Sequence, residues 1–247
     1  MAAALALVEV AAHTGANAVK FQYWSDPLQL AARRRLPPET YQRFQVLPEW
    51  LSTLSRAAKD QGIQFMCTVY LSQDITTVMP WISRFKVASF EAVDFGFLRA
   101  HPAKAHLVIS TGMCNLRELN RLRDFQSAYM GASGIVNLLH CVSAYPAPVT
   151  EMNLVVIRAF GLDGLSDHSG NPCMGAWAVY AGAHVIEVHM RLDETPEDNP
   201  DFPHAHAPHE LGTYIKGIRN AEMVMGIPRK ALQVSEWENL RHRVVLP

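Results

Sequence analysis

The sequence has few cysteines, almost no net charge and no long apolar run. Its four cysteines form no CxxC pair, which argues against a disulfide framework or a zinc ribbon and predicts a reduced, cytoplasmic setting. A net charge of −1 gives no reason to expect a nucleic acid or a membrane surface as partner. No stretch approaches the roughly 18 apolar residues of a transmembrane helix. The apolar start contains Glu9 and His13 and lacks a basic segment, which predicts an amphipathic helix rather than a signal peptide.

Two common nucleotide-binding motifs are also absent, because no GxGxxG follows an early strand and no GxxxxGK[ST] occurs. What the chain does contain is a repeated alternation of short apolar runs with helical stretches. This alternation predicts an α/β fold with a parallel sheet, whose strands are apolar because helices cover them. The predicted strands cover residues 18–22, 63–69, 84–89, 106–111, 136–142, 162–168 and 185–190.

The length of 247 residues and the intervals between the runs favour a TIM-type (β/α)8 barrel over an open sheet. Such a barrel needs eight strands, and the sequence offers seven, beginning within a helix that would follow the first strand. Either the sequence is truncated, so that the barrel lacks its first strand, or the barrel is closed in another way; in both cases we predict a barrel domain over 1–226. An amphipathic helix is expected over 213–225, and the charged residues 227–247 are expected to form a linker or tail.

Polar residues follow the apolar part of several predicted strands, at the end where barrel enzymes place their active sites. Because side chains alternate along a strand, residues two apart share a face and can point into the barrel mouth together. The pairs of this kind are Lys20 and Gln22, Ser166 and His168, and Glu187 and His189.

Histidines end two consecutive predicted strands. The imidazoles of His168 and His189 are expected to converge on one divalent cation, and Mn²⁺, Mg²⁺, Zn²⁺ and Fe²⁺ all suit two histidines with open positions. Taken singly, each residue is better explained as a hydrogen-bonded structural histidine, and it is their pairing at consecutive strand ends that favours the cation. His204, His206 and His209 lie in a segment rich in Asp and Pro, and we interpret them as solvated loop residues.

Two lysines lie in apolar strands, where an unpaired ammonium group is costly to bury. One interpretation is that Lys20 and Lys86 hold the phosphate and carboxylate of an anionic ligand. The alternative is that each pairs with a nearby carboxylate, Glu91 or Glu187. Hydroxyl groups available to the same pocket are those of Thr68, Ser89, Ser110 and Ser166.

Several of these segments together resemble one enzyme family. The sequences AVKFQ, LPEW, FKVASFE, STGM, LLHCVSAYPAP and GLSDHS, followed by EVH and NPD, are similar in order and spacing to N-acetylneuraminate (sialic acid) synthases and their pseudaminic and legionaminic acid relatives. The similarity runs from about Gly15 to Asn239. It implies a cytoplasmic barrel enzyme that condenses phosphoenolpyruvate with the open-chain aldehyde of an N-acetylated hexosamine such as N-acetylmannosamine. The implied products are a nine-carbon 2-keto sugar acid and phosphate.

The resemblance also implies residue roles. His168 and His189 would bind the metal, for which Mn²⁺ is expected and Mg²⁺ is the alternative. Glu91 would position or deprotonate the water that adds to the substrate, and it is assigned a catalytic role with Lys20 and Lys86. Phosphoenolpyruvate would contact Lys20, Lys86, Thr68, Ser89, Ser110 and Ser166. The sugar would contact Gln22, Glu91, Ser143, Tyr145 and Asp201.

The chain also departs from the family pattern. The family's opening strand and its C-terminal antifreeze-like (SAF) domain, which completes a domain-swapped homodimer, have no counterpart here. Phe90 replaces a glycine, Ser143 an asparagine and Val69 a proline, which suggests an altered acceptor sugar. Two other functions stay open: a truncated or degenerate barrel that binds a ligand without turnover, and another metal-dependent barrel aldolase or lyase.

Overall fold

The computed structural model describes residues 1–131 and 133–244. Within these residues, seven strands form one parallel sheet in the order β1 to β7, so that each strand pairs with the next along the chain. All seven predicted strands are confirmed. They are β1 (Ala18–Tyr23), β2 (Gln64–Val69), β3 (Arg84–Val87), β4 (His106–Ser110), β5 (Ile135–Cys141), β6 (Gly164–Asp167) and β7 (Val185–Val188).

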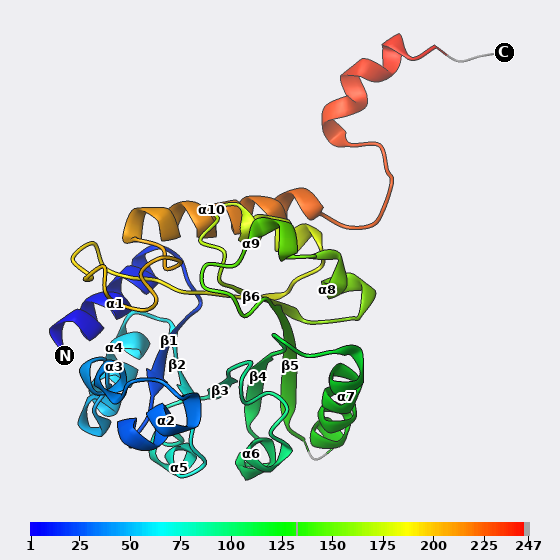
Figure 1. The fold of residues 1–247 in the computed structure, drawn as a ribbon. Coiled ribbons are helices and arrows are strands. Elements are labelled where there is room, and N and C mark those ends of the chain that lie inside the picture. Colours follow the sequence, from blue (N-terminus) through cyan, green and yellow to red (C-terminus); the bar gives the residue numbers. More distant parts are fainter. Residues whose placement is uncertain (132, 245–247) are drawn as a thin grey trace.

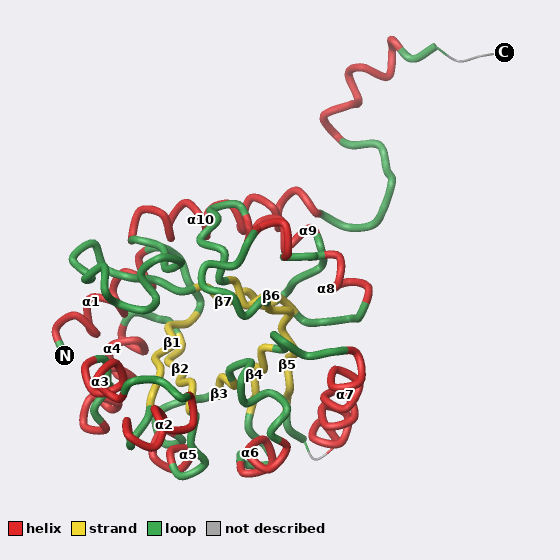
Figure 2. Tube along the Cα trace, viewed as in Figure 1, coloured by secondary structure: helices red, strands yellow, loops and turns green. Residues whose placement is uncertain are grey.

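Helices follow the strands and surround the sheet, which curves around a central space (Figures 1 and 2). The N-terminal segment forms α1, as the sequence predicts. The α-helices are α1 (Ala2–His13), α2 (Pro27–Arg34), α3 (Pro38–Arg43), α4 (Leu51–Asp60), α5 (Asp74–Val78), α6 (Phe95–Ala100), α7 (Leu116–Gly131), α8 (Val155–Ala159), α9 (Met174–Tyr180) and α10 (Pro208–Met225). Short 3₁₀ helices cover η1 (Pro48–Trp50), η2 (Val149–Glu151) and η3 (Val234–His242).

The largest core lies between the outer face of the sheet and the helices, where Val8 of α1 and Leu54 of α4 are fully buried with Leu107 of β4. A smaller cluster fills the inside of the curved sheet. Its buried members Met66, Val108 and Leu139 come from β2, β4 and β5. Apolar strands are thus covered on both faces, which is why the runs in the sequence are nearly continuous rather than alternating.

The sheet is not closed by hydrogen bonds within the described residues, because β1 pairs only with β2 and β7 only with β6. The edges of β1 and β7 therefore face a seam, which α1 and α10 border (Figure 1). A close approach between β6 and β7 requires glycine at position 164, since a Cβ there would lie 1.7 Å from the carbonyl oxygen of Val185.

After α10, residues 226–244 are almost entirely exposed and lead away from the sheet (Figure 1). The predicted amphipathic helix over 213–225 is present as part of α10, which begins five residues earlier at Pro208. None of the helices in the described ranges combines the length and apolarity that a membrane span needs.

His101, at the end of α6, is a buried histidine outside the barrel mouth. Its Nδ1 lies 3.0 Å from the carbonyl oxygen of Phe97, and its ring packs edge-on against Phe85 and Phe97. Burial lowers the pKa of His101 below its usual value. The unfolded chain therefore binds a proton more readily than the folded chain, so acid reduces stability as the pH falls below about 6.5 towards the folded pKa.

We expect the His101→Leu variant to lose less stability than the native chain when the pH is lowered from 7.5 to 5.5. The measurement is urea unfolding at both values, and one such proton changes the free energy of unfolding by up to about 1.4 kcal/mol per pH unit. His13→Leu, at an exposed site, should lose as much stability as the native chain. An equal loss in the His101 variant would contradict the prediction.

Candidate functional site

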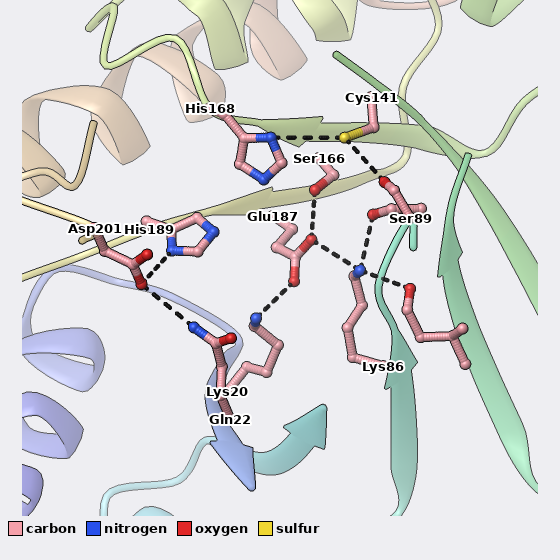
Figure 3. A network of polar contacts seen from close by, with 12 residues as sticks. Lys20, Gln22, Lys86, Ser89, Cys141, Ser166, His168, Glu187, His189 and Asp201 are labelled. Atoms are coloured by element: carbon pink, nitrogen blue, oxygen red, sulfur yellow. Dashed lines mark hydrogen bonds and ion pairs between the residues drawn. The ribbon is translucent and has the colours of Figure 1, made fainter. Parts of the chain in front are cut away.

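The carboxyl ends of β1, β3 and β7 bring two lysines to one carboxylate (Figure 3). Glu187 lies 3.1 Å from the Nζ of Lys20 and 3.3 Å from the Nζ of Lys86, measured to different carboxylate oxygens. Ser166 donates a 2.7 Å hydrogen bond to the same group. Burial alone would raise the pKa of Glu187, but the two ammonium groups hold it well below its usual value. The trio therefore has one positive charge in excess, which favours an anion.

Lys86 is the more deeply buried of the two lysines. Its Nζ donates to Ser110 Oγ at 2.8 Å and to the carbonyl oxygen of Val87 at 2.9 Å. Burial lowers the pKa of Lys86, and Glu187 opposes this change. Of the two carboxylates that the sequence offered as partners for the lysines, Glu187 is the one that pairs with both, whereas Glu91 pairs elsewhere.

Hydroxyl groups line the wall next to Lys86. Thr68 is 1% exposed, and its Oγ1 has no hydrogen-bond partner within the described residues. Ser89 accepts from the backbone N–H of Gly112 at 3.1 Å and donates to Cys141 Sγ. A Cβ at position 112 would lie 2.7 Å from Ser89 Oγ and 2.2 Å from Ser143 Oγ, so a larger residue there would displace both hydroxyls. The hydroxyl of Thr68 can therefore donate a hydrogen bond to an anion at this wall.

The two strand-end histidines lie side by side, with ring centroids 5.2 Å apart (Figure 3). His168 Nδ1 lies 3.1 Å from the carbonyl oxygen of Val142, and His189 Nδ1 lies 3.0 Å from Asp201 Oδ2. Both partners only accept hydrogen bonds, so each Nδ1 carries a proton and Nε2 is the nitrogen left for a ligand. Burial, helped by His189, lowers the pKa of His168 to about 4, which keeps this ring neutral at pH 7.

The interpretation of the three loop histidines as solvated residues is wrong for two of them. His204 is 1% exposed and His206 is 2% exposed, whereas His209 is exposed, as predicted. The loop between β7 and α10 folds back over the mouth and forms a bridge between Met190 and His206. His204 thereby lies 4.7 Å from His189 between ring centroids. The sequence analysis missed this burial, because the hydrophilic composition of the loop does not indicate that it folds back over the mouth.

The residues expected to face a sugar lie around the histidines. Gln22 donates from Nε2 to Asp201 Oδ2 at 3.3 Å and accepts from the hydroxyl of Tyr70. Tyr145 packs against His168 with ring centroids 4.4 Å apart. The structure therefore brings Gln22, Tyr145 and Asp201 to the same side of the mouth as the imidazoles.

Glu91 is fully buried and accepts from Arg34 Nη2 at 2.6 and 2.7 Å. Burial raises the pKa of Glu91, and Arg34 counteracts this. Phe90, the residue that departs from the family pattern, covers the guanidinium of Arg34 at 4.2 Å from its ring centroid. The sequence analysis missed Arg34, because nothing in the run of three arginines distinguishes the one that reaches Glu91.

A cavity of about 900 Å³ connects this mouth to the seam between β1 and β7. Side chains from both sides of the seam line it, among them Lys20, Lys86, Glu187, His189 and Asp201. A polar, positively charged end lies next to an apolar portion. A cavity of this size suits a small-molecule ligand.

Relatives of known activity match most of the chain. An N,N'-diacetyllegionaminic acid synthase from Legionella pneumophila is 33% identical over 91% of this chain and 69% of its own length. A pseudaminic acid synthase from Campylobacter jejuni is 31% identical over 90% of this chain and 70% of its own.

Solved structures match as well. An N-acetylneuraminic acid synthetase from Leptospira borgpetersenii, in complex with citrate, superposes with a TM-score of 0.87 at 24% identity and covers 98% of this chain and 86% of its own, which shows the shared fold. The spore coat polysaccharide biosynthesis protein SpsE of Bacillus subtilis gives a TM-score of 0.75 at 26% identity, over 94% of this chain and 67% of its own. The model of the NeuB family matches residues 7–230, and the chain therefore belongs to the NeuB family.

Proposed function

We propose that this chain condenses phosphoenolpyruvate with the open-chain aldehyde of an N-acetylated hexosamine to give a nine-carbon 2-keto sugar acid and phosphate. The proposal rests on one observation. At a single mouth, the carboxylate of Glu187 pairs with two lysines and lies next to two imidazoles whose Nε2 atoms are available to a ligand. The named relatives support the reaction class, since they are synthases of legionaminic and pseudaminic acids.

Charge and hydrogen bonding determine where phosphoenolpyruvate would lie. Lys20 and Lys86 supply two positive charges against the single charge of Glu187, and this excess would attract an anion with a phosphate and a carboxylate. The free hydroxyl of Thr68 would donate to it, as would rearranged hydroxyls of Ser89, Ser110 and Ser166. Fixing both ends of the enol ester would aim its C3 at the second substrate.

The donors at the mouth also fit a divalent cation, because His168 and His189 lie side by side and each engages its Nδ1 elsewhere, which leaves Nε2 as the nitrogen for a ligand. Asp201 would orient the ring of His189 through Nδ1. A bound cation supplies Lewis acidity to the aldehyde oxygen. Mn²⁺ is the ion we propose from the family resemblance, with Mg²⁺ as the alternative.

The remaining residues would hold the sugar and control water. Gln22, Tyr145 and Asp201 present polar groups next to the imidazoles, where hydroxyls of an open-chain sugar would bind. C3 of the enol ester bonds to the aldehyde carbon, water adds at C2, and phosphate leaves from C2. Glu91 is the candidate to hold or deprotonate that water, and burial raises its pKa above the usual value, which makes it a better base. For this role, Glu91 would have to give up at least one of the hydrogen bonds that it accepts from Arg34.

The test is phosphate release from phosphoenolpyruvate with N-acetylmannosamine and related N-acetylated sugars, with Mn²⁺ or Mg²⁺, and mass spectrometry of the product. We expect release that requires the sugar and the cation, with a product heavier than the sugar by the pyruvate unit. An aldolase would instead cleave a keto acid without phosphoenolpyruvate. Tight phosphoenolpyruvate binding by calorimetry with no phosphate release for any sugar would show a ligand-binding barrel and overturn the proposal.

A further inference from the structure

His204 has an environment that a structural histidine rarely occupies. It is 1% exposed, and neither ring nitrogen has a hydrogen-bond partner within the described residues. The nearest charged atom is Asp201 Oδ1, 3.8 Å from Nε2, which is beyond hydrogen-bonding distance. Burying an imidazole with both nitrogens unpaired costs free energy. A ligand that accepts a lone pair would remove part of that cost.

Three of the neighbours of His204 are potential metal donors. One ligand atom each from His189, Asp201 and His204 lies within 4.8 Å of the others. His168 is next to this group, with its ring centroid 5.8 Å from that of His204. Three imidazoles and one carboxylate thus meet in a single mouth.

We propose that His204 is a third imidazole ligand of the cation at this mouth, with His168 and His189, and that Asp201 lies beside them as orienting group or fourth donor. The inference rests on the proposed function only for the existence of a cation site at the two strand-end histidines. Imidazole nitrogen suits Zn²⁺, Co²⁺ and Fe²⁺, whereas Mg²⁺ and Mn²⁺ prefer oxygen donors. A third nitrogen donor therefore shifts the preference of the site towards Zn²⁺ and Co²⁺.

The experiment measures binding of Zn²⁺ and Co²⁺ alone, in competition with a chromophoric chelator, together with the visible absorption of the Co²⁺ form. His204→Phe keeps an aromatic ring against Tyr145 and His189 and removes both nitrogens. We expect it to weaken Zn²⁺ and Co²⁺ binding about 10- to 100-fold, to change the Co²⁺ spectrum and to leave Mg²⁺ binding nearly unaltered. His204→Gln is the second variant if the first does not fold.

The matched control is His206→Phe, which changes a buried histidine of the same loop that packs on Tyr214 rather than on the imidazole group. It should bind Zn²⁺ and Co²⁺ as the native chain does. Native affinity and an unaltered Co²⁺ spectrum in a folded His204 variant would overturn the inference. Because metal binding is measured without substrates, an absence of phosphate release would overturn the proposed function and leave this inference standing.

Discussion

Replacing His189 by alanine is expected to lower metal-stimulated phosphate release by about 10²- to 10³-fold while the barrel stays folded. The ring lies at the end of β7 and is held by Asp201, with its Nε2 free. Lewis-acid assistance stabilises a transition state by several kcal/mol, and each 1.4 kcal/mol of stabilisation raises the rate about tenfold. The side chain takes no part in the apolar clusters that hold the sheet to its helices.

The measurement is phosphate release from phosphoenolpyruvate and N-acetylmannosamine across a Mn²⁺ titration, with circular dichroism to check the fold. His168→Ala is expected to behave in the same way. His209→Ala, on the exposed first turn of α10, should keep the native rate. Native-like, metal-stimulated rates in the His189 variant would refute the assignment of the strand-end histidines to the cation.

The second large effect is expected at Glu187, where a neutral amide would leave two ammonium groups facing each other. We expect Glu187→Gln to lower the free energy of unfolding by about 3 kcal/mol, because removing one partner of a buried ion pair leaves uncompensated charge. Lys86 is the lysine that suffers most, since it is almost fully buried. Phosphoenolpyruvate should restore part of the loss, because it brings negative charge to the same two lysines.

Urea unfolding with and without phosphoenolpyruvate measures both effects. Glu222→Gln is the control, because its ion pair with Arg219 is exposed and such pairs contribute about 0–1 kcal/mol. A loss at position 187 no larger than at position 222 would show that the lysines are neutral or solvated. It would also remove the electrostatic argument for an anion at this mouth.

Most of the fold could be predicted from the sequence, because parallel strands covered on both faces leave continuous apolar runs. All seven strands were located, and the structure ends five of them, β3 to β7, one or two residues before the predicted carboxyl end. The strands β3, β6 and β7 stop before Ser89, His168 and His189, respectively. These residues follow the last hydrogen-bonded residues of their strands and lie at the mouth. The apolar pattern in the sequence therefore predicts longer strands than the hydrogen bonds define.

The site could be predicted only in part. The alternation of side chains along each strand predicted that Lys20, Glu187 and His189 face one mouth. This was possible because the alternation is a local property of the backbone. The burial of His204 depends on how the loop after β7 returns over the mouth, and the pairing of Glu91 with Arg34 joins segments 57 residues apart. Such contacts depend on tertiary packing, which no local pattern records. The assignment of metal and substrate roles to the site residues stays a prediction.

The candidate site is formed by residues from both sides of the seam between β1 and β7, so it depends on the order in which the chain folds. Within the described residues, polar contacts such as Gln22 with Asp201, 179 positions apart, and Lys20 with Glu187 span it at the mouth. Contacts between such distant positions form only after a long loop has closed, which places them late in folding. We therefore expect the pocket to become ordered late in folding, and a substrate that contacts both edges of the seam would stabilise their association.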